Sequence, residues 1–207
     1  METVSTPIYA VCHEAGGMTA HAWEIDPKRL GFVLARYKFV GRMLEGKQRV
    51  LEVGCADGFG ARVVRQHIGH LTAVDIDAAS IAEARRANCK TWPVDFRVHD
   101  ILGDTVLGEF DAVYALDVIE HMTEEAWFLA TLRDCAPVAI LGAPSLESQG
   151  YASPLSKAGH VNCKTGADFK RALQAHWSQV FVFSMSDETV HTGFQPMAQY
   201  LIGLCVA

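Results

Sequence analysis

The sequence predicts a three-layer α/β domain, in which a mostly parallel sheet of seven strands lies between two layers of helices. Short apolar runs alternate with helical segments between residues 49 and 142, which is typical of strands joined by crossover helices. A glycine-rich turn follows the first apolar run. The chain ends in two strong strands with no helix between them, and such neighbours either pair antiparallel or lie apart.

The expected elements follow one another with short connections. Apolar periodicity and turn residues predict strands over 50–53, 71–74, 94–98, 110–116, 138–142, 179–185 and 200–206. Helical spacing predicts helices over 30–44, 61–68, 78–88, 123–135 and 166–176. Thr123 and Thr165 are placed to cap the last two helices.

Size and composition indicate one ordinary globular domain over residues 1–207. The net charge of −6 and the pI near 5.8 argue against a protein that grips nucleic acid mainly through a basic surface. The six cysteines lie far apart without a CxxC pair, which favours reduced thiols in a cytoplasmic protein. No signal segment and no apolar run of about 20 residues is present, so we expect no membrane anchor.

Two segments lack a clear period. Residues 1–28 are polar and glycine-bearing, so we expect an N-terminal arm or a lid ordered by substrate, with a poorly ordered arm as the alternative. Residues 144–165 form a connection rich in Ser, Gly and Pro that is long for a compact domain, which indicates a substrate loop.

The stretch from 49 to 77 carries the first functional signal. Val50 to Val53 is a buried strand of β-branched character, and the glycines of residues 54–60 permit a tight turn and close approach of a ligand. A helix and a second strand follow, ending at Asp75. Strand, glycine turn, helix, strand and terminal carboxylate form the plan of a nucleoside-binding unit, whose carboxylate bonds ribose hydroxyls.

On these residues the chain resembles the class I methyltransferases that use S-adenosylmethionine, which have a Rossmann-like fold. The family's glycine motif is matched by Glu52, Gly54 and Gly58, with Ala56 at its middle glycine, and Phe110 to Met122 resembles the family's fourth-strand motif. The resemblance implies S-adenosylmethionine as cofactor. The cofactor-binding residues it implies are Glu52, Gly54, Cys55, Ala56, Gly58, Asp75, Ile76, Asp100, Ile101, Leu116 and Asp117.

A nicotinamide dehydrogenase is the competing enzyme class, because it shares the glycine turn and the carboxylate after the second strand. Its turn follows G-x-G-x-x-G, whereas this chain has Gly54, Gly58 and Gly60 and adds Asp100 and the segment 117–121. We therefore favour the methyltransferase. A non-catalytic module that binds S-adenosylmethionine is the alternative from another class, since binding residues alone do not prove turnover.

Histidines are the candidates for catalysis, because methyl transfer to a hydroxyl requires its proton to leave and imidazole suits that task near neutral pH. We select His121, which follows the fourth strand, and His160, in the 144–165 loop. His13, His21 and His191 are further candidates.

If residues 117–121 form a helical turn, Asp117, Glu120 and His121 point toward one face. They then cap the helix start, or supply the general base, or bind a divalent metal together with His160. The last arrangement resembles the E-x-x-E-H motif and distant His of small-RNA 2′-O-methyltransferases, with Asp117 replacing the first Glu. We do not favour a metal, and we predict no metal ligands.

The acceptor is expected to contact the less regular segments. Lys157, His160 and Asn162 offer donors for an anionic or hydroxyl-rich molecule. Lys164 and residues 191–193 are further candidates to line the same cleft. The aromatic residues Trp23, Tyr151 and Phe194 are candidates to close a pocket.

The resemblance thus implies an enzyme that methylates oxygen on a small molecule or a glycan-like intermediate. A metal-assisted RNA 2′-O-methyltransferase is the enzyme alternative, although the acidic net charge makes nucleic acid a poor partner. The oligomeric state does not follow from the sequence.

Overall fold

The computed structural model describes residues 16–103, 108–193 and 195–207, and it confirms the α/β fold with its mostly parallel sheet. The strand order is β3-β2-β1-β4-β5-β8-β6-β7. The strands are β1 Arg49–Val53, β2 His70–Asp75, β3 Asp95–Val98, β4 Ala112–Leu116, β5 Val138–Pro144, β6 Gln179–Ser186, β7 Thr189–His191 and β8 Tyr200–Val206.

The described sheet has eight strands rather than the seven expected from the sequence. The additional strand, β7, lies in the polar segment between the last two expected strands and pairs antiparallel with the end of β6. The turn between them contains Asp187 with φ 52°, a left-handed conformation that Asp tolerates better than most residues. At three residues, β7 is too short to show an alternating pattern in the sequence.

Strand direction follows from the connections. β1, β2, β3, β4 and β5 pair in parallel, and helical crossovers connect successive strands through most of this part of the sheet. β8 pairs antiparallel with both β5 and β6, as expected for a final strand pair without an intervening helix. The parallel strands therefore end at one common edge of the sheet.

Most of the helices follow the sequence pattern with small shifts of their ends, but no helix was expected over residues 17–25 or 154–159. The α-helices are α1 Gly17–Ile25, α2 Lys28–Met43, α3 Ala61–Arg65, α4 Ala78–Arg86, α5 Glu125–Cys135, α6 Pro154–Gly159 and α7 Gly166–Gln174. Thr165 caps α7 by accepting a hydrogen bond from the Asp168 N–H at 3.1 Å. The expected Thr123 cap is wrong, because α5 begins at Glu125 and the Thr123 hydroxyl bonds the Glu124 carboxylate instead.

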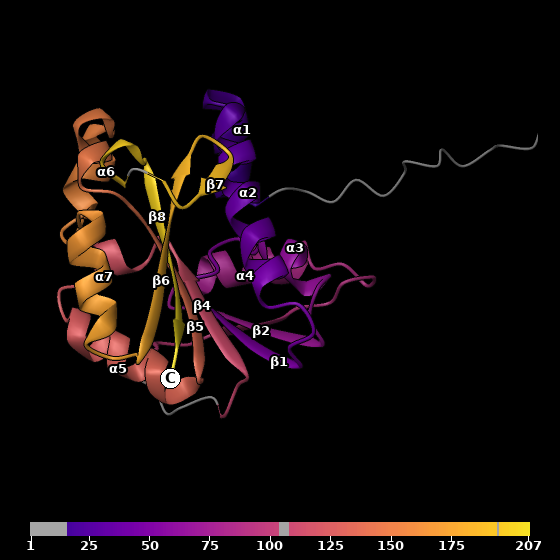
Figure 1. Ribbon diagram of the computed structural model, residues 1–207. Coiled ribbons are helices and arrows are strands. Elements are labelled where there is room, and N and C mark those ends of the chain that lie inside the picture. Colours follow the sequence, from indigo (N-terminus) through magenta and orange to yellow (C-terminus); the bar gives the residue numbers. More distant parts are fainter. Residues whose placement is uncertain (1–15, 104–107, 194) are drawn as a thin grey trace, which may run out of the picture.

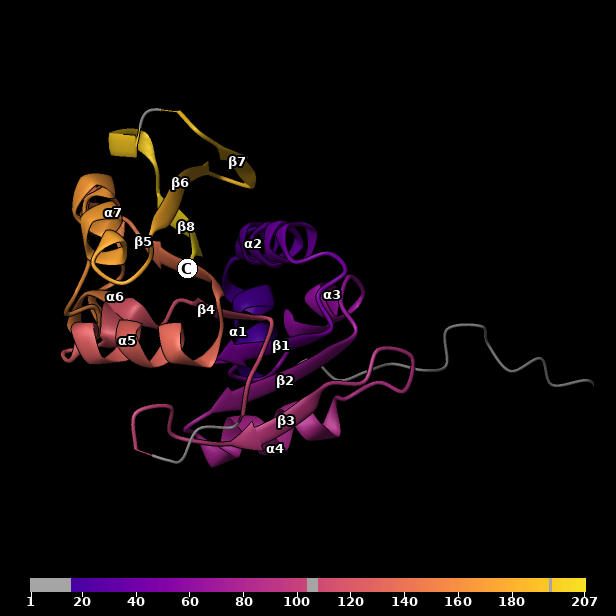
Figure 2. The same ribbon diagram turned by 60° about the horizontal axis from the view of Figure 1, so that its bottom comes forward.

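Two apolar layers sandwich the sheet. Strand residues point alternately to opposite faces, so Val50 packs with α2, α3 and α4, whereas Leu51 and Val53 pack with α5 and α7. Phe128 and Leu132 of α5 are fully buried. Figure 2 shows α2 and α3 on one side of the sheet and α5 on the other.

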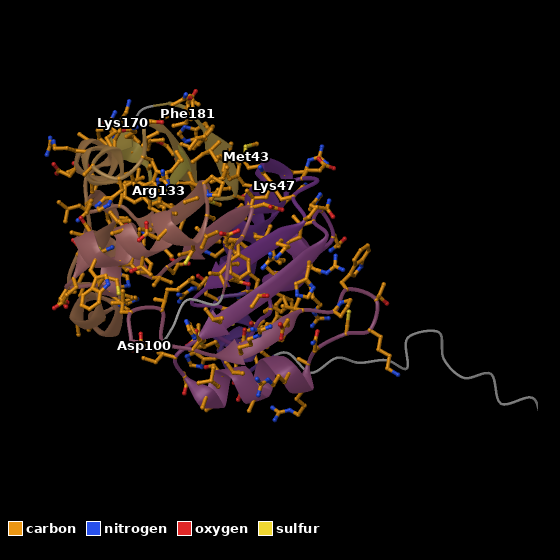
Figure 3. The ribbon with its side chains drawn as sticks, turned by 90° about the horizontal axis from the view of Figure 1, so that it is seen from below. Met43, Lys47, Asp100, Arg133, Lys170 and Phe181 are labelled. Carbon is orange, nitrogen blue, oxygen red and sulfur yellow. The ribbon has the colours of Figure 1, made fainter. Side chains whose placement is uncertain are left out.

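The carboxyl ends of the parallel strands face the part of the molecule that carries α1, α6 and β7 (Figure 1). The opposite edge, seen from below, shows Met43 and Lys47 where α2 ends and the chain enters β1 (Figure 3). No helix among the described residues has the length and apolar character needed to cross a membrane.

Candidate functional site

The glycine turn after β1 has the backbone that its sequence predicts. Gly54 and Gly58 have φ values of 78° and 71°, which favour glycine. A Cβ at Gly54 would lie 2.3 Å from Val118 Cγ2, and one at Gly58 would lie 2.5 Å from the Phe96 ring. The turn therefore needs glycine both for its conformation and for its close packing against β3 and the segment after β4.

Ala56, which stands where the family motif has glycine, also has a positive φ of 47°. Its N–H donates a 2.8 Å hydrogen bond to Asp75 Oδ2, while Asp75 Oδ1 accepts from the Asp77 N–H at 2.9 Å. The carboxylate after β2 is thus fixed against the turn after β1. The neighbouring Ile76 is 69% exposed, so its apolar side chain is open to contact with a ligand ring.

Asp100 and Ile101 follow β3 at the same edge of the sheet, because β3 is parallel to β2. Asp100 Oδ1 accepts a hydrogen bond from the Leu102 N–H at 2.9 Å, and Figure 3 shows Asp100 beyond the end of β3. Ile101 is half-buried.

The side chains of Cys55 and Leu116 are buried in the core. A ligand at these two positions would therefore contact their backbone atoms.

Glu52 lies beneath the turn and is 1% exposed. Burial raises the pKa of its carboxyl to about 7, although the hydroxyls of Tyr114 and Tyr37 oppose this shift. Its Oε2 atom has no hydrogen-bond partner within the described part of the chain. The acid of the glycine motif is therefore a buried group that exchanges its proton near neutral pH.

The start of α1 is anchored on the glycine turn, which the sequence did not reveal. The Thr19 N–H donates to Asp57 Oδ2 at 2.9 Å, and the Gly17 N–H donates to Glu83 Oε2 at 2.7 Å. Both acceptors lie near the start of α1, where helix N–H groups lack intrahelical partners. The sequence signal for this close approach is the pair Gly16-Gly17. Glycine is needed at position 16 because a Cβ there would lie 2.2 Å from the Asp57 Cβ.

Asp117 does not share a helix face with Glu120 and His121. It has φ 57°, and only the 3₁₀ helix η1, Ile119–His121, follows it. Both Asp117 carboxylate oxygens accept from Arg36 Nη1, at 3.1 and 2.8 Å, and the Arg36 guanidinium lies 3.7 Å from the Tyr200 ring centroid. The expected helical turn is wrong because left-handed backbone at Asp117 turns its side chain toward α2.

Arg36 is a site residue that the sequence analysis missed. The amphipathic pattern of α2 puts Arg36 among the polar residues that are expected to face solvent. In the structure, however, its side chain is only 15% exposed. Burial opposes the charge of the guanidinium, but the carboxylate of Asp117 outweighs this effect and raises the pKa of Arg36. Nothing in the spacing of α2 distinguishes Arg36 from an ordinary surface arginine.

Glu120 and His121 come at the end of η1, directly after the strand β4. Glu120 is 1% exposed, and neither of its carboxylate oxygens has a hydrogen-bond partner in the described ranges. Burial, and next the charge of Asp117, raise the pKa of Glu120 well above its usual value. His121 Nε2 lies 4.0 Å from Glu120 Oε1.

The 144–165 connection brings His160 to His121. It contains the 3₁₀ helix η2, Glu147–Tyr151, and the short helix α6. The Asn162 N–H donates to the Glu120 carbonyl at 2.9 Å, and Gly159 O lies 2.8 Å from His121 Nδ1. The two imidazole rings consequently stand edge to face with centroids 5.1 Å apart.

The other candidates lie apart from this pair or have other partners. His13 falls outside the described residues, as does Phe194. His191 is in β7, where its ring contacts Ser186 and the Gly193 N–H. Lys164 pairs with Glu125 and Asn162, and Lys157 donates to the Gly150 carbonyl at 3.1 Å. The two lysines therefore stabilise the loop in this structure.

The parallel sheet, the glycine turn and the acids at its carboxyl edge together form the arrangement that is typical of class I methyltransferases, which use S-adenosylmethionine. Asp75 and Ile76 offer a fixed carboxylate and an open apolar side chain at this edge, which suits a nucleoside.

Known proteins of this class are similar to the chain in sequence and in fold. Residues 50–138 match the family model described as "Methyltransferase domain". A ubiquinone biosynthesis O-methyltransferase of Xanthomonas campestris pv. campestris is 30% identical over 126 residues, and that of Hahella chejuensis is 31% identical over 123. These alignments cover 59% and 58% of this chain but 49% and 48% of the relatives, so the chain matches about half the length of each.

Solved structures share the fold. The plantazolicin methyltransferase BpumL in complex with SAH superposes with a TM-score of 0.69 at 12% identity, covering 91% of this chain and 88% of that one. The N-methyltransferase NodS of Bradyrhizobium japonicum, also with S-adenosylhomocysteine, gives 0.66 at 15% identity, covering 93% and 94%. The methyltransferase domain of bacterial CtHen1 gives 0.64 at 16% identity, covering 84% and 97%.

The packing of the glycine turn yields a stability prediction. Gly54→Ala imposes left-handed backbone on alanine and also drives its Cβ into Val118, whereas Gly46→Ala imposes the same strain at φ 82° with no atom within 4 Å. Strain alone costs about 1–2 kcal/mol, and overpacking adds about 1–3 kcal/mol. Urea unfolding should show the larger loss for Gly54→Ala. Equal losses would contradict the close packing described for the turn.

The buried carboxyl of Glu52 yields a prediction for pH. Its pKa is about 7 in the folded chain and 4.5 when unperturbed, so the folded state retains a proton that the unfolded state releases. Stability from this group is full below pH 4.5 and is lost as pH rises through 7, by up to about 3 kcal/mol.

Glu52→Gln should remove this dependence. Urea unfolding at pH 5 and pH 8 should show a smaller fall for Glu52→Gln than for wild type. Glu188→Gln, at the exposed β6–β7 turn, serves as control and should keep the wild-type slope. Parallel slopes for all three proteins would mean that Glu52 ionises as in the unfolded chain.

Proposed function

We propose that the chain transfers the methyl group of S-adenosylmethionine to a hydroxyl oxygen of a small molecule or a sugar-like acceptor. The observation that carries this proposal is the pair of His121 and His160. They meet after the carboxyl end of β4, where Val118 packs against Gly54 of the glycine turn. A hydroxyl must lose its proton during methyl transfer, and this pair provides imidazoles for that step.

The donor would lie across the carboxyl ends of β1, β2 and β3. Asp75 is assigned to the ribose hydroxyls, because its carboxylate is held in place by the Ala56 N–H. Asp100 is assigned to the adenine amine, with Ile76 and Ile101 beside the ring. Gly54 to Gly58 and the backbone at Leu116 and Asp117 would contact the methionine part of the donor.

The reaction is an in-line displacement in which the acceptor oxygen forms a bond to the methyl carbon as the bond from sulfur breaks. The electron pair of that bond stays on sulfur, giving the neutral thioether product, and the acceptor proton passes to a base. Because the sulfonium carries its own activation, the chain mainly aligns acceptor, methyl and sulfur. Burial, and next the charge of His121, lower the pKa of His160, so a neutral imidazole is available at neutral pH.

The acceptor is assigned to α1 and the 144–165 loop. Both segments lie toward the carboxyl ends of the parallel strands (Figure 1). Both expose large apolar side chains, with Trp23 of α1 64% exposed and Tyr151 and Val161 of the loop 95% and 61% exposed. An acceptor with an apolar ring or chain would cover these groups, which supports α1 as the lid and residues 144–165 as the substrate loop of one domain.

The relatives named for ubiquinone biosynthesis support oxygen as the accepting atom. The alignment with these relatives covers 59% of this chain, so it does not include the whole of both acceptor segments. The chain resembles the CtHen1 domain in fold alone, so this similarity does not support the same acceptor. The net charge of −6 favours a small acceptor over RNA.

Removal of the Asp75 carboxylate tests the donor assignment. Asp75→Ala loses hydrogen bonds from a charged group, worth about 1.5–3 kcal/mol, so S-adenosylhomocysteine should bind roughly 10- to 100-fold more weakly by calorimetry. Asp134→Ala, an exposed carboxylate near the end of α5, is the control and should bind normally. Unchanged affinity of Asp75→Ala, with circular dichroism like wild type, would remove the ribose assignment.

Replacement of the histidine pair tests the proton-transfer role. His121→Ala with His160→Ala should lower kcat by about 10²- to 10⁴-fold while S-adenosylhomocysteine affinity is retained. His70→Ala, at the start of β2 on the opposite edge, should leave kcat unchanged. Turnover is measured as S-adenosylhomocysteine formed with a panel of phenols and sugars, and mass spectrometry locates the methyl group.

Two outcomes would overturn the proposal. A methyl group found on nitrogen or carbon would reject oxygen as the accepting atom. A wild-type chain that binds the donor but methylates nothing in the panel or in a broad metabolite extract would indicate a binding module instead.

A further inference from the structure

Strand β6 has an open side over most of its length. One side pairs antiparallel with β8 from Gln179 to Met185. The other side pairs with β7 only from Ser184 to Ser186. Residues 179–183 are therefore an edge of the sheet that no described strand covers, and we call this segment the open edge.

The pairing of the neighbouring strands shows how the backbone of β6 is turned. The Ala207 N–H donates to the Pro137 carbonyl at 2.9 Å, just beyond the paired residues Val138 and Val206. In an antiparallel ladder such a bond identifies Val138 and Val206 as a non-hydrogen-bonded pair. The N–H and C=O of Val206 therefore point away from β5 and toward β6, where they bond Gln179.

Backbone groups alternate in direction along a strand. Because Gln179 bonds β8, Phe181 and Phe183 also bond β8, whereas Val180 and Val182 direct their N–H and C=O outward from the open edge. Among the residues that the structure describes, none forms a hydrogen bond with these outward groups. The open edge thus presents backbone donors and acceptors that a further strand can bind.

The open edge lacks the features that usually prevent edge strands from pairing, which are charged side chains and proline. Neither occurs from Trp177 to Ser186. Phe181 is 51% exposed, and Figure 3 shows it at the rim of the molecule. Phe183, in contrast, packs against the Phe39 ring of α2 with centroids 5.0 Å apart. The strand is therefore anchored in the fold while its outer side stays available.

A second copy of the chain fits the open edge by symmetry. When two β6 strands pair antiparallel about a two-fold axis at Phe181, Val180 of each copy lies opposite Val182 of the other. These are the residues whose backbone groups point outward, so each such pair exchanges two N–H···O=C bonds. The two Phe181 side chains then meet in a non-hydrogen-bonded pair, where side chains approach most closely and aromatic pairs are favourable.

The charges at the ends of the open edge also suit a second copy. Extended past the strand ends, the same register brings the β6–β7 turn of one copy, with Asp187 and Glu188, toward the end of α7 in the other. Near its end α7 carries Lys170 and Arg171, and His176 follows the helix. Opposite charges therefore approach one another twice, once at each end of the paired strands.

We propose that residues 179–183 form the interface of a symmetric homodimer, in which the sheets of two copies join into one continuous sheet. The strands β4, β5 and β8 separate β6 from β1, so the glycine turn of each copy stays free to bind the donor. The inference does not depend on the reaction that the chain catalyses.

Val182→Pro tests the backbone pairing. Proline removes an N–H that the fold itself does not use, and edge strands tolerate proline at such positions. By sedimentation equilibrium at micromolar concentrations we expect a dimeric wild type and a dissociation constant at least about tenfold higher for Val182→Pro. Val190→Pro is the matched control, since Val190 pairs with Met185 and likewise points its N–H away from β6, but lies in β7. It should dimerise as wild type does.

Charge exchange at Phe181 tests the symmetry. Phe181→Lys and Phe181→Asp should each be monomeric alone, because the two-fold axis sets like charges directly opposite one another. An equal mixture of the two variants should form a heterodimer, whose mass is identified by native mass spectrometry. Unfolded variants would not regain dimers on mixing. Trp127→Lys changes a 61% exposed side chain on α5 and should remain dimeric.

Two results would overturn the proposal: a wild type that is monomeric throughout the micromolar range, or dimers that persist in Val182→Pro and in both Phe181 variants. Each variant is also titrated with S-adenosylhomocysteine, which should bind as it does to wild type and so show that the variant folds. A dimeric wild type that methylates nothing would reject the proposed function and retain the interface, so the two can fail separately.

Discussion

Parallel strands bring the residues that follow them to a single edge of the sheet, and the rest of the candidate site is built on this constraint. β1 is hydrogen-bonded to β2 on one side and to β4 on the other, so the glycine turn lies between the strand ends that carry Asp75 and Asp117. The bond from the Ala56 N–H to Asp75 Oδ2 then ties two of these strand ends together. Replacing either strand by an antiparallel one would move its carboxyl end to the other edge.

The site divides into two parts with different physical origins. The donor part is made of backbone turns and short acidic side chains, and it is rigid because Val118 and Phe96 pack directly against Gly54 and Gly58. The acceptor part is made of a helix and a long connection. The connection is fixed to η1 because the Asn162 N–H donates to the Glu120 carbonyl and the Gly159 carbonyl accepts from His121 Nδ1. Its geometry therefore depends on contacts between segments about 40 residues apart.

Buried carboxyl groups occur in both parts, and each is buried for a different reason. Glu52 lies beneath the turn with Tyr37 and Tyr114, whereas Glu120 ends η1 beside two histidines without a hydrogen-bond partner in the described chain. Burial raises the pKa of both groups. Such groups are costly to a fold, and they are common where charge must be handled during a reaction.

Local pattern was enough for the fold and the donor part. Apolar runs such as Val50 to Val53 fix strands through burial, and the residues that directly follow a parallel strand must lie at its carboxyl edge, so Asp75 and Asp100 could be placed from spacing alone. Thr165 was recognised as a helix cap for the same reason, since capping involves residues only three apart.

The tertiary structure decided what spacing could not. Helical spacing predicted that Asp117, Glu120 and His121 share one face, but a left-handed backbone at Asp117 and its pairing with Arg36 separate it from the other two. The docking of α1 on Asp57 and the meeting of His121 with His160 likewise join distant segments. Sequence fixes contacts that depend on neighbours along the chain, whereas these contacts arise only when separate loops pack at one edge of the sheet.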